Sequence, residues 1–181
     1  MKIKTIVINL FGEPSAGKST AAMDITARLK RKGINAEYVS EFAKDKVYEN
    51  NSEVFKHQEY IFGKQSFKMG RTRDNVQVIV TDSPLLFNII YNDDDKILGE
   101  DFNKVVLKMF NSYENRNYVL TRYHKYENEG RRQNEEESTK VRLNLLDLLN
   151  YLNVQYKWYT SSEEDCNAIA DEIAKEIKEH E

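Results

Sequence analysis

The chain has 181 residues, 40% of them hydrophobic, and a formal net charge of −3. This length predicts one domain over residues 1–181, and the slightly acidic balance excludes a general attraction to nucleic acid or to an anionic membrane. No apolar stretch approaches the ~20 residues that span a bilayer, and the single cysteine, Cys166, leaves no intrachain disulfide. We therefore expect a cytoplasmic monomer or homodimer with no membrane partner, in which Cys166 packs in the core.

The first two predicted elements are a strand over residues 4–11 and a helix over residues 18–32 that ends at Gly33. Between them, residues 12–19 read Gly-Glu-Pro-Ser-Ala-Gly-Lys-Ser, which completes the pattern G-x-x-x-x-G-K-[ST]. The glycines let the backbone curl so that several N–H groups converge on one anion, and the helix aims its positive dipole end at the same point. A full match between a strand and a helix predicts a phosphate-binding loop.

This loop predicts that the chain binds a nucleoside triphosphate with Mg²⁺. Lys18 can reach the β- and γ-phosphates, and the Ser19 hydroxyl can bind the metal ion. The alternative is a glycine-rich turn that binds nothing, but such a turn would not require Lys18 and Ser19. The residues expected to bind the cofactor here are Gly12, Glu13, Pro14, Ser15, Ala16, Gly17, Lys18, Ser19 and Thr20.

Strand-like and helix-like patterns alternate along the rest of the chain, which predicts an α/β fold with a parallel sheet and helices on both faces. The expected strands cover residues 35–40, 76–81, 118–121 and 154–159. A long region over residues 41–74 has helical apolar spacing. Further helices are expected over residues 85–91, 100–113 and 143–152, and after Ser161 or Ser162, which can cap the last helix.

Two carboxylates directly follow predicted strands, at the edge where open parallel sheets bind ligands. Asp82 would hold Mg²⁺ directly or through water, with Ser19 as the other protein ligand. Its alternative role is that of a turn-forming residue before Ser83. Glu41 would accept or orient the proton of an acceptor hydroxyl, and its alternative role is to complement the dipole at a helix N-terminus.

Three arginines flank a charged segment that follows the predicted strand at 118–121: Arg122, Arg131 and Arg132. Guanidinium groups suit phosphate oxygens, so we expect at least one of the three to contact phosphate. The segment itself, about residues 123–138, would be a lid that brings in an arginine and excludes water when it closes. The alternative is an exposed loop in which arginines pair with neighbouring glutamates.

Gln65, in the helical region after the second strand, is a candidate contact to the acceptor substrate. A glutamine amide can read a nucleobase edge in two directions at once, and aromatic residues such as Tyr60 and Phe62 lie nearby in the sequence. A plain helix surface over an aromatic core is the alternative.

Two other classes of P-loop protein fit the sequence less well. Asp82 is followed by Ser83 where NTPases that activate water often carry a second carboxylate, which weakens a motor ATPase interpretation. A GTPase is disfavoured because no D-x-x-G follows the strand at 76–81 and no [NT]-K-x-D sequence occurs.

Taken together, these features resemble P-loop kinases that phosphorylate nucleosides, nucleotides and related small molecules. The chain is similar to the nicotinamide riboside kinase domain of bacterial NAD regulators and to related phage AAA-domain ATPase/kinase proteins. Besides the phosphate loop, residues 39–44 look like the segment V-x-E-[YF]-A-R, with Lys44 for arginine. Residues 129–132 look like the lid motif D-G-x-R, with Glu129 for aspartate. Both departures fall on segments that face the acceptor in such kinases.

The resemblance implies a three-layer fold with strand order 2-3-1-4-5 and an ATP-dependent transfer of the γ-phosphate to a nucleoside- or nucleotide-like acceptor. It implies catalytic roles for Lys18, Glu41, Asp82 and Arg132. Two other readings stay open: a phage kinase acting on a modified base in DNA, and a nucleotide-dependent ATPase switch or binding module without an acceptor. The acidic composition counts against a DNA partner.

Overall fold

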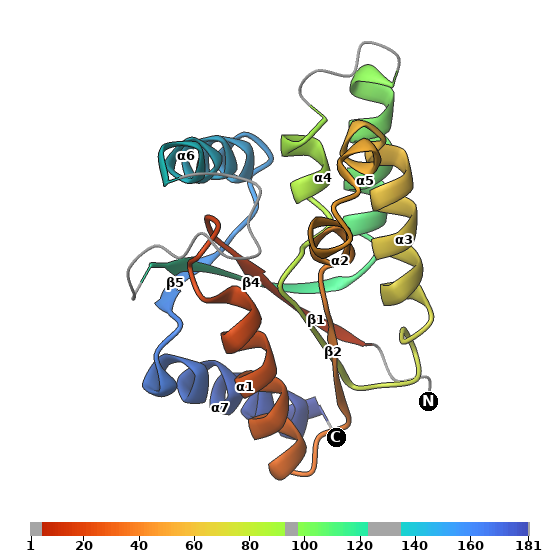
Figure 1. Cartoon of the computed structure of the whole chain (residues 1–181). Helices are drawn as coiled ribbons and strands as arrows, with labels where there is room; N and C mark the ends of the chain where they lie inside the picture. The colour runs from red at the N-terminus through yellow and green to blue at the C-terminus, as the bar shows by residue number, and fades with distance from the viewer. Residues whose placement is uncertain (1–4, 93–97, 123–134, 181) are drawn as a thin grey trace.

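The protein is built on one parallel five-stranded sheet with helices on both faces (Figure 1). The computed structural model describes residues 5–92, 98–122 and 135–180. The strands are β1 (Ile6–Phe11), β2 (Ala36–Val39), β3 (Val78–Thr81), β4 (Glu114–Thr121) and β5 (Lys157–Thr160). Their order across the sheet is β2-β3-β1-β4-β5, which confirms the predicted fold class and strand order.

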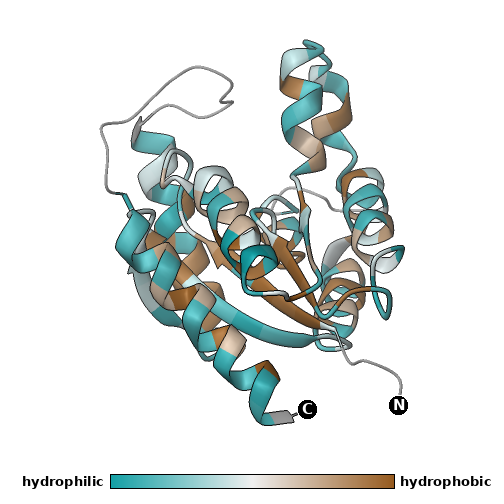
Figure 2. Cartoon of the chain, turned by 90° about the horizontal axis from the view of Figure 1, so that it is seen from below, coloured by the Kyte–Doolittle hydropathy of each residue, from teal (hydrophilic) through white to brown (hydrophobic). Residues whose placement is uncertain are grey.

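The central strand β1 separates two hydrophobic cores. Ile8 and Leu10 point into the core shared with α1 (Lys18–Arg31) and α7 (Glu163–His180). Val7 and Phe11 point into the core on the opposite face. The helices of that face are α3 (Gln58–Gly70), α4 (Phe87–Ile90), α5 (Gly99–Phe110) and α6 (Glu135–Tyr151). All of β1 is buried, because its residues are apolar except for Asn9, as suits a strand covered on both faces. Figure 2 shows the same arrangement, with hydrophobic stretches gathered on the inside.

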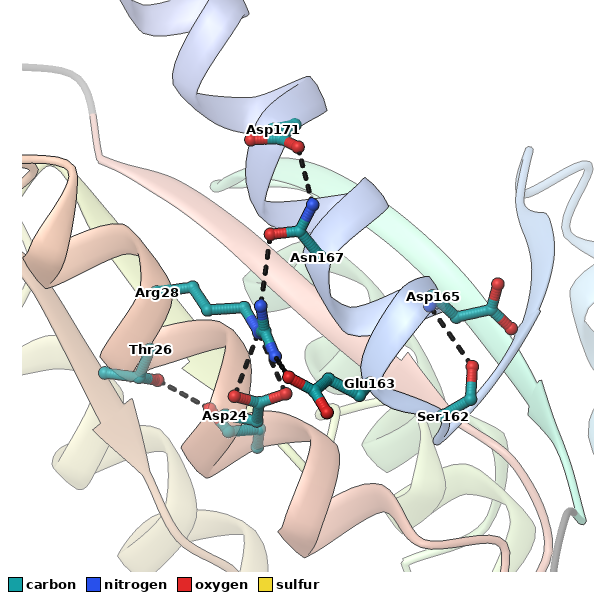
Figure 3. A network of polar contacts seen from close by, with 9 residues as sticks. Asp24, Thr26, Arg28, Ser162, Glu163, Asp165, Asn167 and Asp171 are labelled. Carbon is teal, nitrogen blue, oxygen red and sulfur yellow. Dashed lines mark hydrogen bonds and ion pairs between the residues drawn. The ribbon is translucent and has the colours of Figure 1, made fainter.

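The helix after the phosphate loop is fixed to the last helix by a polar network (Figure 3). Arg28 on α1 donates to both carboxylate oxygens of Asp24, at 3.0 Å each. The same guanidinium reaches α7, where it donates to Glu163 at 3.0 Å and to Asn167 at 3.1 Å. Partly exposed pairs of this kind add little stability singly, but together they fix how α1 lies against α7.

The predicted helical region at 41–74 consists of three pieces. They are α2 (Phe42–Tyr48), a 3₁₀ turn η1 (Ser52–Lys56) and α3. Asn50 takes a left-handed φ of 53° just after α2, and the run Asn50-Asn51-Ser52 favours local turns over a continuous helix. Apolar spacing alone did not detect this break.

Two strand boundaries also differ from the prediction. β4 begins four residues early, at Glu114, because its polar residues have partners inside the sheet. Asn9 on β1 donates to the side-chain oxygens of Asn115 at 2.8 Å and Asn117 at 3.0 Å. β5 begins at Lys157, three residues later than expected.

Several local predictions are confirmed. α1 ends in a turn in which the Ile34 N–H donates to the Leu29 carbonyl, with Gly33 at a positive φ. Ser162 caps α7, since its Oγ accepts the Asp165 N–H at 3.2 Å. Among the described residues, no helix has the length and apolar character needed to cross a bilayer.

Cys166 packs in the α1/α7 core with 1% of its surface exposed, as predicted. Burial raises the pKa of the Cys166 thiol to about 11 from an ordinary 9.0. Since the thiolate is the reactive form, we expect an aromatic disulfide reagent at pH 8 to modify the native protein at least ~10²-fold more slowly than the urea-unfolded protein. Equal rates before and after unfolding would contradict this packing.

Candidate functional site

The phosphate loop is held in its curl by two glycines at which the chain comes very close to other backbone or side-chain atoms. A Cβ at Gly12 would lie 2.7 Å from the Leu120 carbonyl oxygen, and Gly12 has φ +143°. A Cβ at Gly17 would lie 2.2 Å from the Ser161 Oγ, and Gly17 has φ +81°. Ser15, between them, also has a positive φ of 65°. The loop therefore stores local strain that the surrounding sheet maintains.

Lys18 begins α1 and bends back over the loop. Its Nζ donates to the carbonyl oxygens of Gly12 and Glu13, both at 2.9 Å, and lies 5.6 Å from the centre of the Phe87 ring. Gly17 occupies the N-cap without a side-chain hydrogen bond to the helix. The first N–H groups of a helix have no intrahelical acceptor, so this end of α1 attracts an anion beside a lysine ammonium.

Asp82 and Glu41 lie next to each other at the carboxyl ends of the neighbouring strands β3 and β2. The Asp82 carboxylate accepts the Glu41 backbone N–H at 3.0 Å and the Tyr38 hydroxyl at 2.7 Å. Asp82 is buried, and burial together with the Asp82 charge raises the pKa of Tyr38 far above its ordinary value. Tyr38 therefore stays protonated as a donor. The same phenol also interacts with the Ser19 hydroxyl, so Ser19 and Asp82 converge around it.

Two residues of α3 position the segment that carries Glu41. The Lys68 ammonium donates to the Ser40 carbonyl at 2.7 Å and to its Oγ at 2.9 Å, and burial lowers the pKa of Lys68. Gln65 is 1% exposed, and its Oε1 accepts the Phe42 N–H at 3.0 Å. The structure thus places Gln65 behind the start of α2, as a support for the residue next to Glu41.

These elements surround a cavity of about 410 Å³, a size that suits small-molecule ligands. One side is the phosphate loop, and the other side is formed by α2, η1 and the start of α4. Glu41 and Asp82 lie between them. Apart from the loop and the two carboxylates, the lining residues are largely apolar or aromatic, among them Ala43, Val47, Tyr48, Phe55, Ile61, Phe87 and Tyr91, with Lys44, Gln58 and Asn88 in the same lining.

Arg122, predicted to bind phosphate, contacts the outer side of the loop. Its guanidinium lies 3.0 Å from the Glu13 carboxylate and 3.1 Å from the Ser138 Oγ. Arg131 and Arg132 lie outside the described residues, as does the predicted lid at positions 123–134. Residues 135–138 form the start of α6, where Ser138 is buried and donates to the Pro14 carbonyl at 3.0 Å.

Sequence reasoning missed several residues of this site. Tyr38 lies in the middle of β2, and strand periodicity gives no sign that its hydroxyl reaches Asp82. Ser161 was considered only as a helix cap, yet it packs against Gly17. Gln58 and Gln65 are both glutamines of the predicted helical region, and Gln58 lines the cavity whereas Gln65, the one predicted to contact the acceptor, does not. Long-range packing decides the positions of Tyr38 and Ser161, so no local pattern could identify them.

Residues 7–165 match a known protein family described as an AAA domain. Because the match spans most of the chain, the chain belongs to this family. No curated protein sequence matches it.

Solved structures share the fold and confirm the resemblance drawn from the sequence. NadR protein in complex with NR gives a TM-score of 0.68 at 17% identity, over 92% of this chain and 51% of that one. NadR protein in complex with NAD and AMP-PNP gives 0.62 at 16% identity, over 92% and 49%. Deoxyadenosine kinase from M. mycoides with bound dATP gives 0.57 at 18% identity, over 92% and 98%. The chain spans about half the length of the NadR chains. The α/β P-loop fold of this chain is therefore one that it shares with NadR and deoxyadenosine kinase.

The Gly17→Ala substitution tests how tightly the loop is held. The new Cβ would collide with Ser161 and force a left-handed backbone on a residue that resists it, so we expect a loss of about 2 kcal/mol in the free energy of unfolding. Gly63→Ala is the matched control, because Gly63 lies within α3 and a Cβ there meets nothing within 4 Å. That variant should gain up to about 1 kcal/mol. Urea unfolding measures both, and equal stability of the two variants would refute the close approach.

Proposed function

We propose that the chain is an ATP-dependent phosphotransferase that moves the γ-phosphate of ATP to a hydroxyl or phosphate of a nucleoside- or nucleotide-like acceptor. The observation that carries this proposal is that a single cavity is lined by the phosphate loop, by Glu41 and Asp82, and by aromatic residues of α2, η1 and α4. A switch that only binds a triphosphate needs only the part of this cavity that the phosphate loop lines. A kinase needs all of it, since a second ligand must lie in line with the γ-phosphate.

The aromatic lining of the cavity supports a flat acceptor. It includes Tyr48, Phe55 and Tyr91, and aromatic faces stack well on a planar ring. Gln58 and Asn88 lie in the same wall and have amides that can hydrogen-bond a base or an amide substituent. The NadR and deoxyadenosine kinase structures named above hold NR, AMP-PNP or dATP, which is the same chemical class.

The chemistry follows from the positions of two side chains, Glu41 and Lys18. For a hydroxyl acceptor, the acceptor oxygen forms a bond to the γ-phosphorus while the bond from that phosphorus to the bridging oxygen of ADP breaks. Glu41 takes the hydroxyl proton, since it lines the cavity beside the loop. Lys18 moves its ammonium from the loop carbonyls to the phosphate oxygens and stabilises the charge that develops there.

The donor set around Tyr38 fits Mg²⁺. A serine hydroxyl and an aspartate carboxylate are hard oxygen ligands. Ser19 and Asp82 both interact with the Tyr38 hydroxyl, so the two side chains lie near each other. Bound there, Mg²⁺ would neutralise charge on the β- and γ-phosphates. Tyr38 and the Glu41 N–H would hold the Asp82 carboxylate in place for this role.

The experiment that tests the proposal measures ADP formation with and without a panel of nucleosides and nucleotides. Mass spectrometry of each mixture identifies any phosphorylated product. We expect one class of acceptor to raise ADP formation and to gain one phosphate. Slow hydrolysis that no acceptor changes would overturn the kinase in favour of a nucleotide-dependent switch.

Two substitutions separate the roles of the acidic residues. Asp82→Asn should raise the Mg²⁺ concentration for half-maximal activity at least ~10-fold, because the metal loses a charged ligand. Glu41→Gln should lower kcat ~10²-fold or more and leave the ATP affinity nearly unchanged, because only proton transfer suffers.

Tyr38→Phe is the matched control for Asp82→Asn, since it removes one hydrogen bond to Asp82 and keeps the carboxylate. Its Mg²⁺ requirement should shift much less. Equal losses of ATP affinity in Asp82→Asn and Glu41→Gln would refute this division of roles.

A further inference from the structure

The phosphate loop carries an acidic residue of its own. Glu13 is the second residue of the loop, its side chain is 7% exposed, and it is not among the cavity-lining residues. Its backbone carbonyl belongs to the cradle, because it accepts a hydrogen bond from Lys18 Nζ at 2.9 Å. The loop must bind a triphosphate with a carboxylate buried in its own wall. Two negative charges close together in one loop repel each other strongly where water is largely excluded. An uncompensated Glu13 carboxylate would therefore oppose triphosphate binding.

Arg122 compensates this charge. It directly follows β4, and its guanidinium lies 3.0 Å from the Glu13 carboxylate. The arginine side chain is only 18% exposed, so water screens the pair weakly. The pair also connects two elements distant in sequence, the loop after β1 and the end of β4.

A second contact from the same arginine fixes the other side of the loop. The Arg122 guanidinium donates to the Ser138 Oγ at 3.1 Å, and Ser138 donates in turn to the Pro14 carbonyl at 3.0 Å. Ser138 is fully buried in the first turn of α6. Two consecutive loop residues, Glu13 and Pro14, are therefore held by one network from outside the cavity.

We infer that Arg122 supports triphosphate binding through Glu13 and not by contact with phosphate. It is a positioning residue: it neutralises the carboxylate inside the loop wall and holds the loop in the shape that receives the phosphates. Arg122 is absent from the cavity lining, which agrees with an indirect role. The inference rests on the proposed function, since it concerns the triphosphate that the kinase uses.

The two possible roles predict opposite results for a double variant. If Arg122 acts through Glu13, removing both charges leaves the loop wall neutral, and triphosphate affinity recovers. If Arg122 binds phosphate directly, removing Glu13 cannot restore the missing contact. Four variants of the full chain therefore decide the matter: Arg122→Met, Glu13→Gln, the double variant, and Arg122→Lys, which keeps the charge.

The measurement is the dissociation constant of AMP-PNP with Mg²⁺, determined by titration calorimetry on proteins shown to be folded by thermal unfolding. We expect Arg122→Met to bind at least ~10-fold more weakly, as removal of a neighbouring charge commonly does. Arg122→Lys and the double variant should bind within ~3-fold of the unmodified chain, whereas Glu13→Gln, which leaves the Arg122 charge uncompensated, should bind at least as tightly as the unmodified chain. Arg116→Met is the matched control, because Arg116 lies on β4, the strand that Arg122 follows, and pairs with Glu176 on α7. It should leave the affinity unchanged.

A double variant as weak as Arg122→Met would overturn the inference and make Arg122 a direct phosphate ligand. Unchanged affinity in Arg122→Met would overturn it as well. Both results leave the proposed kinase intact. An unmodified chain that fails to bind AMP-PNP would instead remove the proposed function, and this inference with it.

Discussion

The site depends on a curled backbone that only glycine can form at two positions. Gly12 lies against the Leu120 carbonyl at the end of β4, and Gly17 lies against Ser161 after β5. These approaches hold the loop, which follows β1, against the carboxyl ends of β4 and β5. The loop can then be strained, with Ser15 at a positive φ, because the buried sheet around it supplies the stability. The direction of α1, and with it the anion site at its first turn, follows from this curl.

The parallel sheet provides the second half of the site. Because β2 and β3 are neighbours with the same direction, the residues that follow them come to one edge. Asp82 and Glu41 meet there, and Tyr38 connects Asp82 to Ser19 of the loop. Tyr38 thus lies between the phosphate loop and the carboxylate that follows β3. α3 supports this network from behind, through Lys68 on Ser40 and Gln65 on Phe42.

Much of this arrangement could be predicted from the sequence, because its strongest signals are local. The loop pattern, the apolar run of β1, and the carboxylates directly after β2 and β3 are all contiguous stretches, and the alternation of elements predicts the parallel sheet. The partners that complete the site come from distant segments. Nothing near Arg122 in the sequence indicates that it pairs with Glu13, which lies 109 positions earlier in the chain. β4 was predicted too short, since the asparagines of its first half resemble a loop until Asn9 is seen beside them.

The central claim is that the γ-phosphate of ATP is transferred to a second molecule bound in the same cavity, and that the Lys18 ammonium stabilises this transfer. Its most direct test uses ATP labelled with ¹⁸O in the γ-phosphate and follows the label into the acceptor by mass spectrometry. Lys18→Ala should transfer label at least ~10²-fold more slowly than the unmodified chain, because the ammonium stabilises charge only as the phosphate moves. Lys104→Ala, an exposed substitution on α5, should transfer it at the normal rate. Label that appears only in inorganic phosphate, or equal transfer in the Lys18→Ala protein, would contradict the account.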